Sequence, residues 1–270
     1  MKSYLLSFIT VVLFFHSYSQ TAEEYFNKAE QARQQNNYKE AINNYNLAIK
    51  LKQDYFDAFL QRAKVYTEIG NLEEALEDVN TLIKYNVNSG EAYMQRGIIK
   101  YKMQKYKDAI EDFNKLIDYN YTNKEVFLYK AKSNYYLGYL NKALPDLYKA
   151  LAFDSLNFEI YYYLAQVKKV YGYEKDANED LDKAILIKPD YIEALHSRAE
   201  NKSILKDYFG AIDDYNKLIQ LNSKDYIAYI NRGVIKITLS DREGGCADFQ
   251  KAKELNSMEA LDAIKKYCDY

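Results

Sequence analysis

Small residues recur along this chain at a fixed interval of 34 residues. Six of them are alanines and the seventh is a glycine: Ala41, Ala75, Ala109, Ala143, Ala177, Ala211 and Gly245. Self-similarity at one period indicates a single supersecondary unit stacked many times, with each copy burying its apolar face against its neighbours. The pattern therefore favours a binding function over catalysis.

Each interval contains the signals of two helices. A large residue follows each small residue after four positions and an aliphatic one after seven, as Tyr45 and Ala48 follow Ala41, which places all three on one helical stripe. A second series of small residues lies twelve positions before the first: Ala29, Ala63, Gly97, Ala131, Ala165, Ala199 and Gly233. Small residues at fixed points on both helices predict a hairpin whose two backbones approach closely.

Glycine and proline mark the helix ends. Gly70, Gly138 and Gly172 lie between the two predicted helices of their units, where glycine adopts the left-handed C-cap conformation without steric penalty. Pro189 ends the fifth unit. Pro145 instead lies inside a predicted helix and predicts a mild kink near Asn141, either a local irregularity or a hinge that alters the curvature.

This order of small, aromatic and alanine positions resembles the tetratricopeptide repeat family, although tyrosine or phenylalanine replaces the family's tryptophan. The resemblance covers about residues 22 to 268 and implies an all-α fold, a right-handed α-solenoid of seven helix-turn-helix units with a C-terminal capping helix. We expect one domain over residues 20–270, with a capping helix at 258–268 and repeats at 22–55, 56–89, 90–123, 124–157, 158–191, 192–225 and 226–259.

The first nineteen residues have the pattern of a secretory signal peptide. Lys2 precedes an apolar run from Tyr4 to Phe15, which is too short to span a bilayer, and small residues lead to a cleavage site after Ser19. We therefore expect an exported protein, periplasmic or secreted, with no transmembrane segment after cleavage. No cysteine follows the apolar run, which disfavours a lipid anchor.

Charge and composition argue against several other functions. Without Lys2 the chain has 36 basic and 39 acidic residues, a formal charge of −3, and this mild acidity disfavours nucleic acid as a partner. The only histidine after the signal segment is His196, whose ExxH spacing with Glu193 is half of a di-iron motif that lacks its other half. Glycine-rich phosphate loops and nucleophile motifs are absent from the sequence. We expect no catalytic residues, metal, cofactor or small-molecule substrate; an all-helical hydrolase is the remote alternative.

The two cysteines, Cys246 and Cys268, both lie near the C-terminus. A turn near Asn256 would bring them together across two antiparallel helices, and the bridge would contribute about 3 kcal/mol in the chain-entropy model. We predict a disulfide, with two free buried thiols as the alternative. A redox or metal role is disfavoured because no CxxC motif or histidine lies nearby. The segment after the turn places Met258, Leu261 and Ile264 on one face, as a capping helix requires.

In this family the first helix of each unit lines a concave groove, and the resemblance implies a partner-binding role for the residues here that share that register. They are Met94, Ile98 and Tyr101 in the third unit, Leu128, Tyr129, Tyr135 and Tyr136 in the fourth, and Tyr162 and Tyr163 in the fifth. Tyrosine supplies large amphipathic contact area at low entropic cost. The chain has 30 tyrosines, however, so packing between helices is the alternative role. Phe26 and Glu30 replace the lysine and asparagine of the family's carboxylate clamp, which disfavours that mode.

The seventh unit adds an apolar stripe to its first helix: Ile227, Ile230, Val234 and Ile237. The capping segment, a neighbouring subunit or the target could cover it. The function predicted from the sequence is a non-enzymatic scaffold that binds a protein or peptide segment in its concave groove, within an envelope or secreted complex. The alternative is homo-oligomeric assembly through the stripe.

Overall fold

The computed structural model of the chain describes residues 20–85 and 89–269; the predicted signal segment lies outside them. Over this part of the chain the fold is all-α, with fifteen helices and no strand. None of the helices found there combines the length and the hydropathy that crossing a membrane requires.

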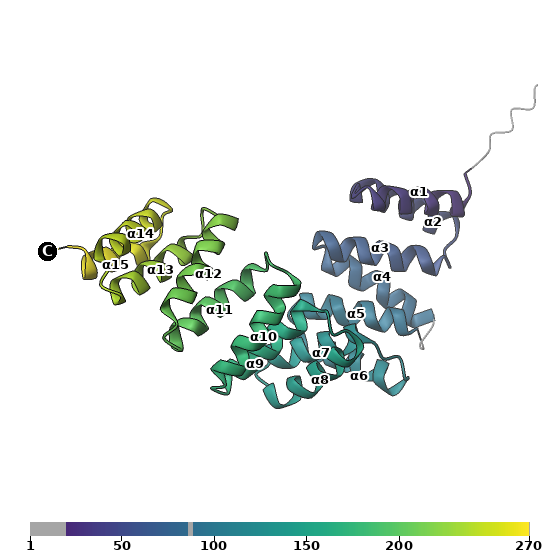
Figure 1. The fold of residues 1–270 in the computed structure, drawn as a ribbon. Coiled ribbons are helices and arrows are strands. Elements are labelled where there is room, and N and C mark those ends of the chain that lie inside the picture. The colour runs from purple at the N-terminus through teal and green to yellow at the C-terminus, as the bar shows by residue number, and fades with distance from the viewer. Residues whose placement is uncertain (1–19, 86–88, 270) are drawn as a thin grey trace, which may run out of the picture. The chain divides into compact units, whose positions relative to one another are not determined.

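First and second helices alternate along the chain (Figure 1). The first helices are α1 (Ala22–Gln34), α3 (Phe56–Ile69), α5 (Gly90–Lys102), α7 (Lys124–Tyr136), α9 (Phe158–Val170), α11 (Ile192–Ile204) and α13 (Tyr226–Thr238). The second helices are α2 (Tyr38–Leu51), α4 (Leu72–Tyr85), α6 (Tyr106–Asp118), α8 (Leu140–Phe153), α10 (Glu174–Ile187), α12 (Tyr208–Leu221) and α14 (Arg242–Glu254). Helix α15 (Met258–Tyr267) follows them. Both series begin every 34 residues, and we number each first helix with the second helix after it as one repeat.

The chain forms two compact units that divide between Gln95 and Arg96. In the first unit α1 packs against α2, α2 against α3, and α3 against α4. In the second unit every helix from α6 to α14 packs against the next one along the chain. Packing in chain order is the arrangement of an all-α solenoid.

The small residues of the two 34-residue series are buried where the helices of a repeat meet. A Cβ added to Gly97 would lie 2.5 Å from the Phe113 ring, and one added to Gly233 would lie 2.7 Å from the Phe249 ring. Glycine takes this first-helix position only in these two repeats, where the facing second-helix residue is phenylalanine. In the other five repeats alanine faces tyrosine, valine or leucine. In the third and seventh repeats the phenylalanine ring thus occupies the space that an alanine methyl would need.

Gly245 departs from the six alanines of its series for a steric reason. A Cβ there would lie 2.7 Å from the Ile237 side chain and 2.9 Å from the Gly233 carbonyl oxygen. The Ile237 side chain and the neighbouring backbone occupy the space that an alanine methyl fills in the other repeats.

The turn between the two helices of a repeat has a residue with left-handed backbone conformation at the same position in all seven repeats. Gly70, Gly138 and Gly172 have φ values of 85°, 76° and 77°, as their glycine identity predicts. The equivalent residues in the other four repeats are not glycine but also have positive φ: Asn36, Gln104, Lys206 and Ser240. The turn geometry is therefore set by the packing of the two helices, and glycine relieves its strain in three repeats only.

Helix α8 continues through Pro145 and remains one helix from Leu140 to Phe153. The proline has no amide hydrogen to donate to the Asn141 carbonyl, four residues before it. The helix thus loses one hydrogen bond without ending.

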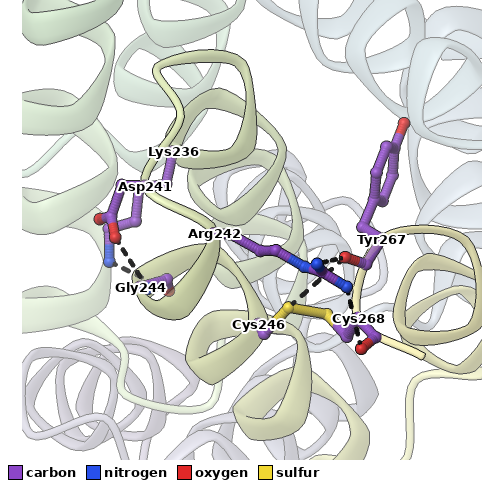
Figure 2. The surroundings of a disulfide bond; sticks show 7 residues. All are labelled: Lys236, Asp241, Arg242, Gly244, Cys246, Tyr267 and Cys268. Carbon is purple, nitrogen blue, oxygen red and sulfur yellow. Dashed lines mark hydrogen bonds between the residues drawn. A yellow bond between two sulfur atoms is a disulfide. The ribbon is translucent and has the colours of Figure 1, made fainter. Parts of the chain in front are cut away.

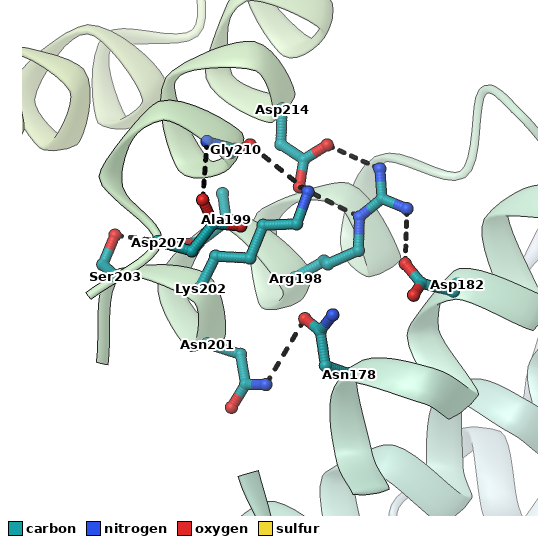
Figure 3. Close-up of polar contacts among 10 residues, drawn as sticks. All are labelled: Asn178, Asp182, Arg198, Ala199, Asn201, Lys202, Ser203, Asp207, Gly210 and Asp214. Atoms are coloured by element: carbon teal, nitrogen blue, oxygen red, sulfur yellow. Dashed lines mark hydrogen bonds and ion pairs between the residues drawn. The ribbon is translucent and has the colours of Figure 1, made fainter. Parts of the chain in front are cut away.

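Buried aspartates form another 34-residue series, which the sequence analysis did not identify: Asp78, Asp112, Asp146, Asp180, Asp214 and Asp248. Each forms an ion pair with a basic residue on the first helix of its own repeat. In the sixth repeat, Arg198 donates from Nε and Nη2 to both oxygens of Asp214, at 2.9 and 2.5 Å (Figure 3). Its Nη1 donates to Asp182 on the preceding second helix at 2.8 Å, so that one guanidinium joins two repeats. We call this arrangement the arginine bridge.

Helix α15 is held to α14 by several contacts (Figure 2). The sulfur atoms of Cys246 and Cys268 are bonded, with the two Cα atoms 5.9 Å apart. Arg242 donates from Nε to the Tyr267 carbonyl at 2.9 Å and from Nη2 to the Cys268 carbonyl at 3.2 Å. The prediction for Met258 was wrong: it is 75% exposed, because α15 begins at that residue and buries Ala260 instead.

Substituting the left-handed turn residues will change stability in opposite directions. No atom lies within 4 Å of a Cβ added to Gly172, so Gly172→Ala costs only backbone strain, and we expect the free energy of unfolding to fall by about 1 kcal/mol. Lys206→Gly removes the same strain, but glycine loses more entropy on folding, so we expect the free energy of unfolding to rise by only about 0.5 kcal/mol. Urea unfolding measures both, and a neutral Gly172→Ala would contradict this explanation of the turns.

Candidate functional site

Tyrosine rings connect successive first helices of the second unit. Tyr101 on α5 lies 5.3 Å from Tyr129 on α7, measured between ring centroids, and Tyr135 on α7 lies 5.5 Å from Tyr163 on α9. Tyr162 on α9 lies 5.3 Å from Tyr191, which precedes α11. The 34-residue period explains this contact pattern, because Tyr101 and Tyr135, like Tyr129 and Tyr163, are equivalent residues of adjacent repeats. We call Tyr101, Tyr129, Tyr135, Tyr136, Tyr162, Tyr163 and Tyr191 the tyrosine cluster.

A lysine lies inside this cluster. The Lys132 Nζ atom is 5.3, 5.0 and 5.3 Å from the ring centroids of Tyr101, Tyr129 and Tyr163, and 3.0 Å from Glu159 Oε2. The lysine is only 8% exposed. Its charge is stabilised by the faces of three rings and by one carboxylate, so a single ammonium group joins α5, α7 and α9.

Burial widens the pH range over which several phenols of the cluster stay protonated. It raises the pKa of Tyr101 and Tyr163 well above the ordinary value, and it raises the pKa of Tyr162 to about 12. The hydroxyls of Tyr136 and Tyr163 are 3.2 Å apart and share a hydrogen bond. Tyr101, Tyr162 and Tyr163 therefore contribute contact area rather than phenolate charge even in moderately alkaline solution.

The structure assigns different environments to the residues predicted for the groove. Tyr136 is half exposed, whereas Met94, Ile98, Tyr101, Tyr129, Tyr135 and Tyr162 are partly buried. Tyr163 is buried among the other rings. The prediction for Leu128 was wrong: it is 5% exposed and belongs to a core cluster with Ala131 and Leu147, so it leaves almost no surface for a partner. Packing between helices accounts for most of the tyrosine positions, and Tyr136 is the most exposed of them.

Two hollows lie along the first helices beyond the tyrosine cluster. One, of about 320 Å³, lies between α9 and α11 and is lined by Tyr162, Gln166, Lys169, Ile192, Glu193, His196, Ser197 and Glu200. The other, of about 290 Å³, lies between α11 and α13 and is lined by Glu200, Ser203, Ile204, Tyr215, Asn231, Val234 and Ile235. Glu200 lines both, so the two hollows adjoin, and together we call them the first-helix groove.

Hydrogen bonds between helices hold the walls of the groove. Gln166 Nε2 donates to Ser197 Oγ at 2.7 Å, and Lys169 Nζ donates to the same oxygen at 3.0 Å. Lys169 also pairs with Glu200 at 3.5 Å. His196 Nε2 lies 2.7 Å from Asp225 Oδ2, whose residue caps α13. Sequence reasoning missed Gln166 and Glu200, which share the helix register of Ile98 and Val234, and Lys169, which shares the register of Tyr101 and Tyr135.

The seventh-repeat stripe divides into covered and exposed residues. Ile230 packs against the cluster that contains Ala252 and Ala260, and Ile237 lies against Gly245. Ile227 and Val234 are exposed, and Val234 lines the first-helix groove. The molecule itself covers half of the stripe, and of the two exposed residues Val234 faces the groove.

His196 and Glu193, which the sequence places in an ExxH spacing, can be examined as a metal site. His196 and Glu193 lie on one hollow wall, but the described residues contain no group of three or more histidine, cysteine, aspartate or glutamate side chains placed to hold a metal. The histidine's nearest polar partner is the capping carboxylate of Asp225.

Comparison with protein families places these repeats. A TPR repeat model matches residues 30–70, which are parts of the first and second repeats. A tetratricopeptide repeat model matches residues 90–123, the whole third repeat. The chain is a tetratricopeptide repeat protein. No curated protein sequence matches it.

Solved structures share the fold of this tetratricopeptide repeat protein. A tetratricopeptide repeat protein from Parabacteroides merdae has a TM-score of 0.66 at 18% identity, over 91% of this chain and 96% of that one. The C-terminal part of a TPR repeat-containing protein from Cytophaga hutchinsonii has a TM-score of 0.63 at 20% identity, over 88% and 99%. YrrB, described as a TPR protein with an unusual peptide-binding site, has a TM-score of 0.54 at 17% identity, over 68% and 95%. The family supports a protein-interaction scaffold, and its members are generally non-enzymatic.

The raised pKa of Tyr162 predicts a loss of stability at alkaline pH. The pKa of Tyr162 is about 12 in the folded protein and about 10 in the unfolded chain. The protonated phenol therefore contributes fully to the free energy of unfolding below pH 10, and this contribution is lost as the pH rises toward 12. We expect Tyr162→Phe to reduce the fall in the free energy of unfolding between pH 10 and pH 12 by about 2 kcal/mol. Urea unfolding across this pH range measures it, with the exposed Tyr148→Phe as the control; equal slopes for the two variants would contradict the prediction.

Proposed function

We propose that this tetratricopeptide repeat protein is a non-enzymatic scaffold that binds an extended segment of a partner protein in the first-helix groove. The observation that carries the proposal is the pair of adjoining hollows that share Glu200. Hydrogen bonds between α9 and α11 hold the first hollow in shape before any partner arrives. A preformed surface loses less conformational entropy on binding, which favours affinity.

The lining of the groove indicates which side chains the segment carries. Tyr162 provides an aromatic surface at one end, and Val234 and Ile204 provide an apolar one at the other. Glu193 and Glu200 lie between these ends. An extended segment with a basic residue flanked by aromatic or aliphatic residues complements this order of surfaces.

We also propose that the protein acts outside the cytoplasm, in an envelope or secreted complex. The proposal rests on the signal-peptide pattern of residues 1–19 and on the Cys246–Cys268 disulfide, since disulfides persist mainly in oxidising compartments. Homo-oligomerisation through the seventh-repeat stripe receives less support, because Ile230 and Ile237 are packed within the molecule and leave a small apolar area.

Charge reversal in the groove tests this proposal. The mature protein, residues 20–270, would be used to capture partners from its own envelope fraction, and the affinity of the captured protein would then be measured by titration calorimetry. We expect Glu200→Lys and Val234→Asp each to weaken binding about tenfold, because each places an uncompensated charge in the contact.

The matched control is Leu186→Lys, which changes an exposed residue of α10 outside the groove. Thermal melting followed by circular dichroism verifies that each variant is folded. If both groove variants bind the partner as tightly as the unaltered protein does, the first-helix groove is not the binding site.

A further inference from the structure

Three of the arginine bridges have the same three charges. In the third, sixth and seventh repeats, one buried aspartate holds an arginine guanidinium and a lysine ammonium at the same time. For example, Asp248 accepts from Arg232 at 2.9 and 2.6 Å and lies 2.9 Å from Lys236 Nζ. These repeats show that one carboxylate in this position accommodates both cations.

The fourth repeat lacks the guanidinium. Lys130 stands where the third, sixth and seventh repeats have arginine, and Asn134 stands where those three repeats have the lysine. Asp146 is only 4% exposed, and its ion pair with Lys130 Nζ is 3.4 Å long, against 2.5 to 3.0 Å for the pairs in the three complete bridges. The carboxylate keeps one ammonium partner and is left without the second cation.

A cavity of about 410 Å³ occupies the place of the missing group. Lys130, Asn134 and Asp146 line it, together with Asn114 on the preceding second helix. Asn114 is equivalent to Asn216, which accepts from Arg232 Nη1 at 2.6 Å in the seventh repeat. The cavity therefore contains every residue of an arginine bridge except the arginine.

The fifth repeat shows that losing the arginine does not by itself leave a cavity there. Leu164 replaces the arginine in that repeat and is 2% exposed, so an apolar side chain fills the space. Lys168 Nζ lies 2.6 Å from Asp180 and supplies the ammonium. The fourth repeat is different because its lysine leaves the space open.

We propose that this cavity binds the guanidinium group of an arginine that carries a free carboxylate. The guanidinium donates to Asp146 and Asn114, in the geometry that Arg232 and Arg198 adopt in their own repeats, and Lys130 keeps its place on Asp146. The remaining charges of the lining, Lys107 and Lys142, oppose a bare cation and favour a ligand with a carboxylate of its own. Free arginine and a C-terminal arginine of a partner protein share this chemistry.

Titration calorimetry on the mature protein separates the possible ligands. We expect L-arginine to bind about tenfold more tightly than L-citrulline, which lacks the cationic guanidinium, and about tenfold more tightly than agmatine, which lacks the carboxylate. A short peptide that ends in arginine, compared with the same peptide amidated at its C-terminus, distinguishes a protein source from the free amino acid. Tighter binding of the acid peptide than of free arginine identifies a partner's C-terminus as the ligand.

Two variants locate the binding in this cavity. Lys130→Arg supplies the guanidinium from the chain itself, so we expect the loss of arginine binding together with a higher melting temperature; Lys183→Arg, outside the cavity, is the control. In the double variant Lys107→Ala/Lys142→Ala, arginine and agmatine should bind equally. The proposal is overturned if arginine gives no binding heat at millimolar concentration, if citrulline binds equally well, or if Lys130→Arg binds arginine like the unaltered protein.

Discussion

The contact between two small residues inside each helix pair is the constraint on which the rest of this structure depends. One small residue on the first helix and one on the second let the two backbones approach closely, and in the third and seventh repeats a methyl group added to the first-helix glycine has no room. At Gly233 and Gly245 the approach is limited by backbone atoms of the facing helix, at 3.0 and 2.9 Å from the added Cβ. Because every repeat uses the same contact, every first helix has the same neighbours, and equivalent side chains of adjacent repeats meet.

The distinctive surfaces of this protein arise where a repeat departs from the others. The tyrosine cluster extends from Tyr101 in the third repeat through the fourth and fifth repeats, which have no arginine on the buried aspartate. The Lys132 ammonium connects the first helices there. The cavity beside Asp146 arises from Lys130 and Asn134, and the exposed half of the isoleucine stripe arises in the last repeat. The repeated residues build the frame, and the exceptions supply distinctive surfaces.

Much of the fold follows from the sequence because its determinants are local and periodic. The 34-residue spacing, the glycines at the turns and the alanine positions predict the helices, since each depends on residues of one repeat or its neighbour. The aspartate series had the same signal and was visible in the sequence, but its partners lie twelve or sixteen residues away on another helix. The left-handed turns at Gln104 and Lys206 carry no sequence signal, because packing imposes them on residues that do not favour them.

The candidate site was less predictable, because it depends on helix rotation. Leu128 and Tyr129 are consecutive residues of α7 with different environments: Leu128 is buried in the core, whereas Tyr129 belongs to the tyrosine cluster. Periodicity alone does not resolve rotations that small. The cavity beside Asp146 could not be predicted from the sequence either. It depends on how much of the space between the helices the Lys130 side chain fills, and the sequence does not give that space.

A double-mutant cycle at Gly97 and Phe113 tests the small-residue contact most directly. Helix propensity alone predicts that Gly97→Ala stabilises the protein by about 1 kcal/mol, whereas the contact predicts a loss of about 1 to 3 kcal/mol. Phe113→Leu, which reproduces the alanine and leucine pair of the fourth and fifth repeats, should recover at least about 1 kcal/mol of that loss in the double variant. A stabilising Gly97→Ala, or strictly additive free energies of unfolding, would contradict the account.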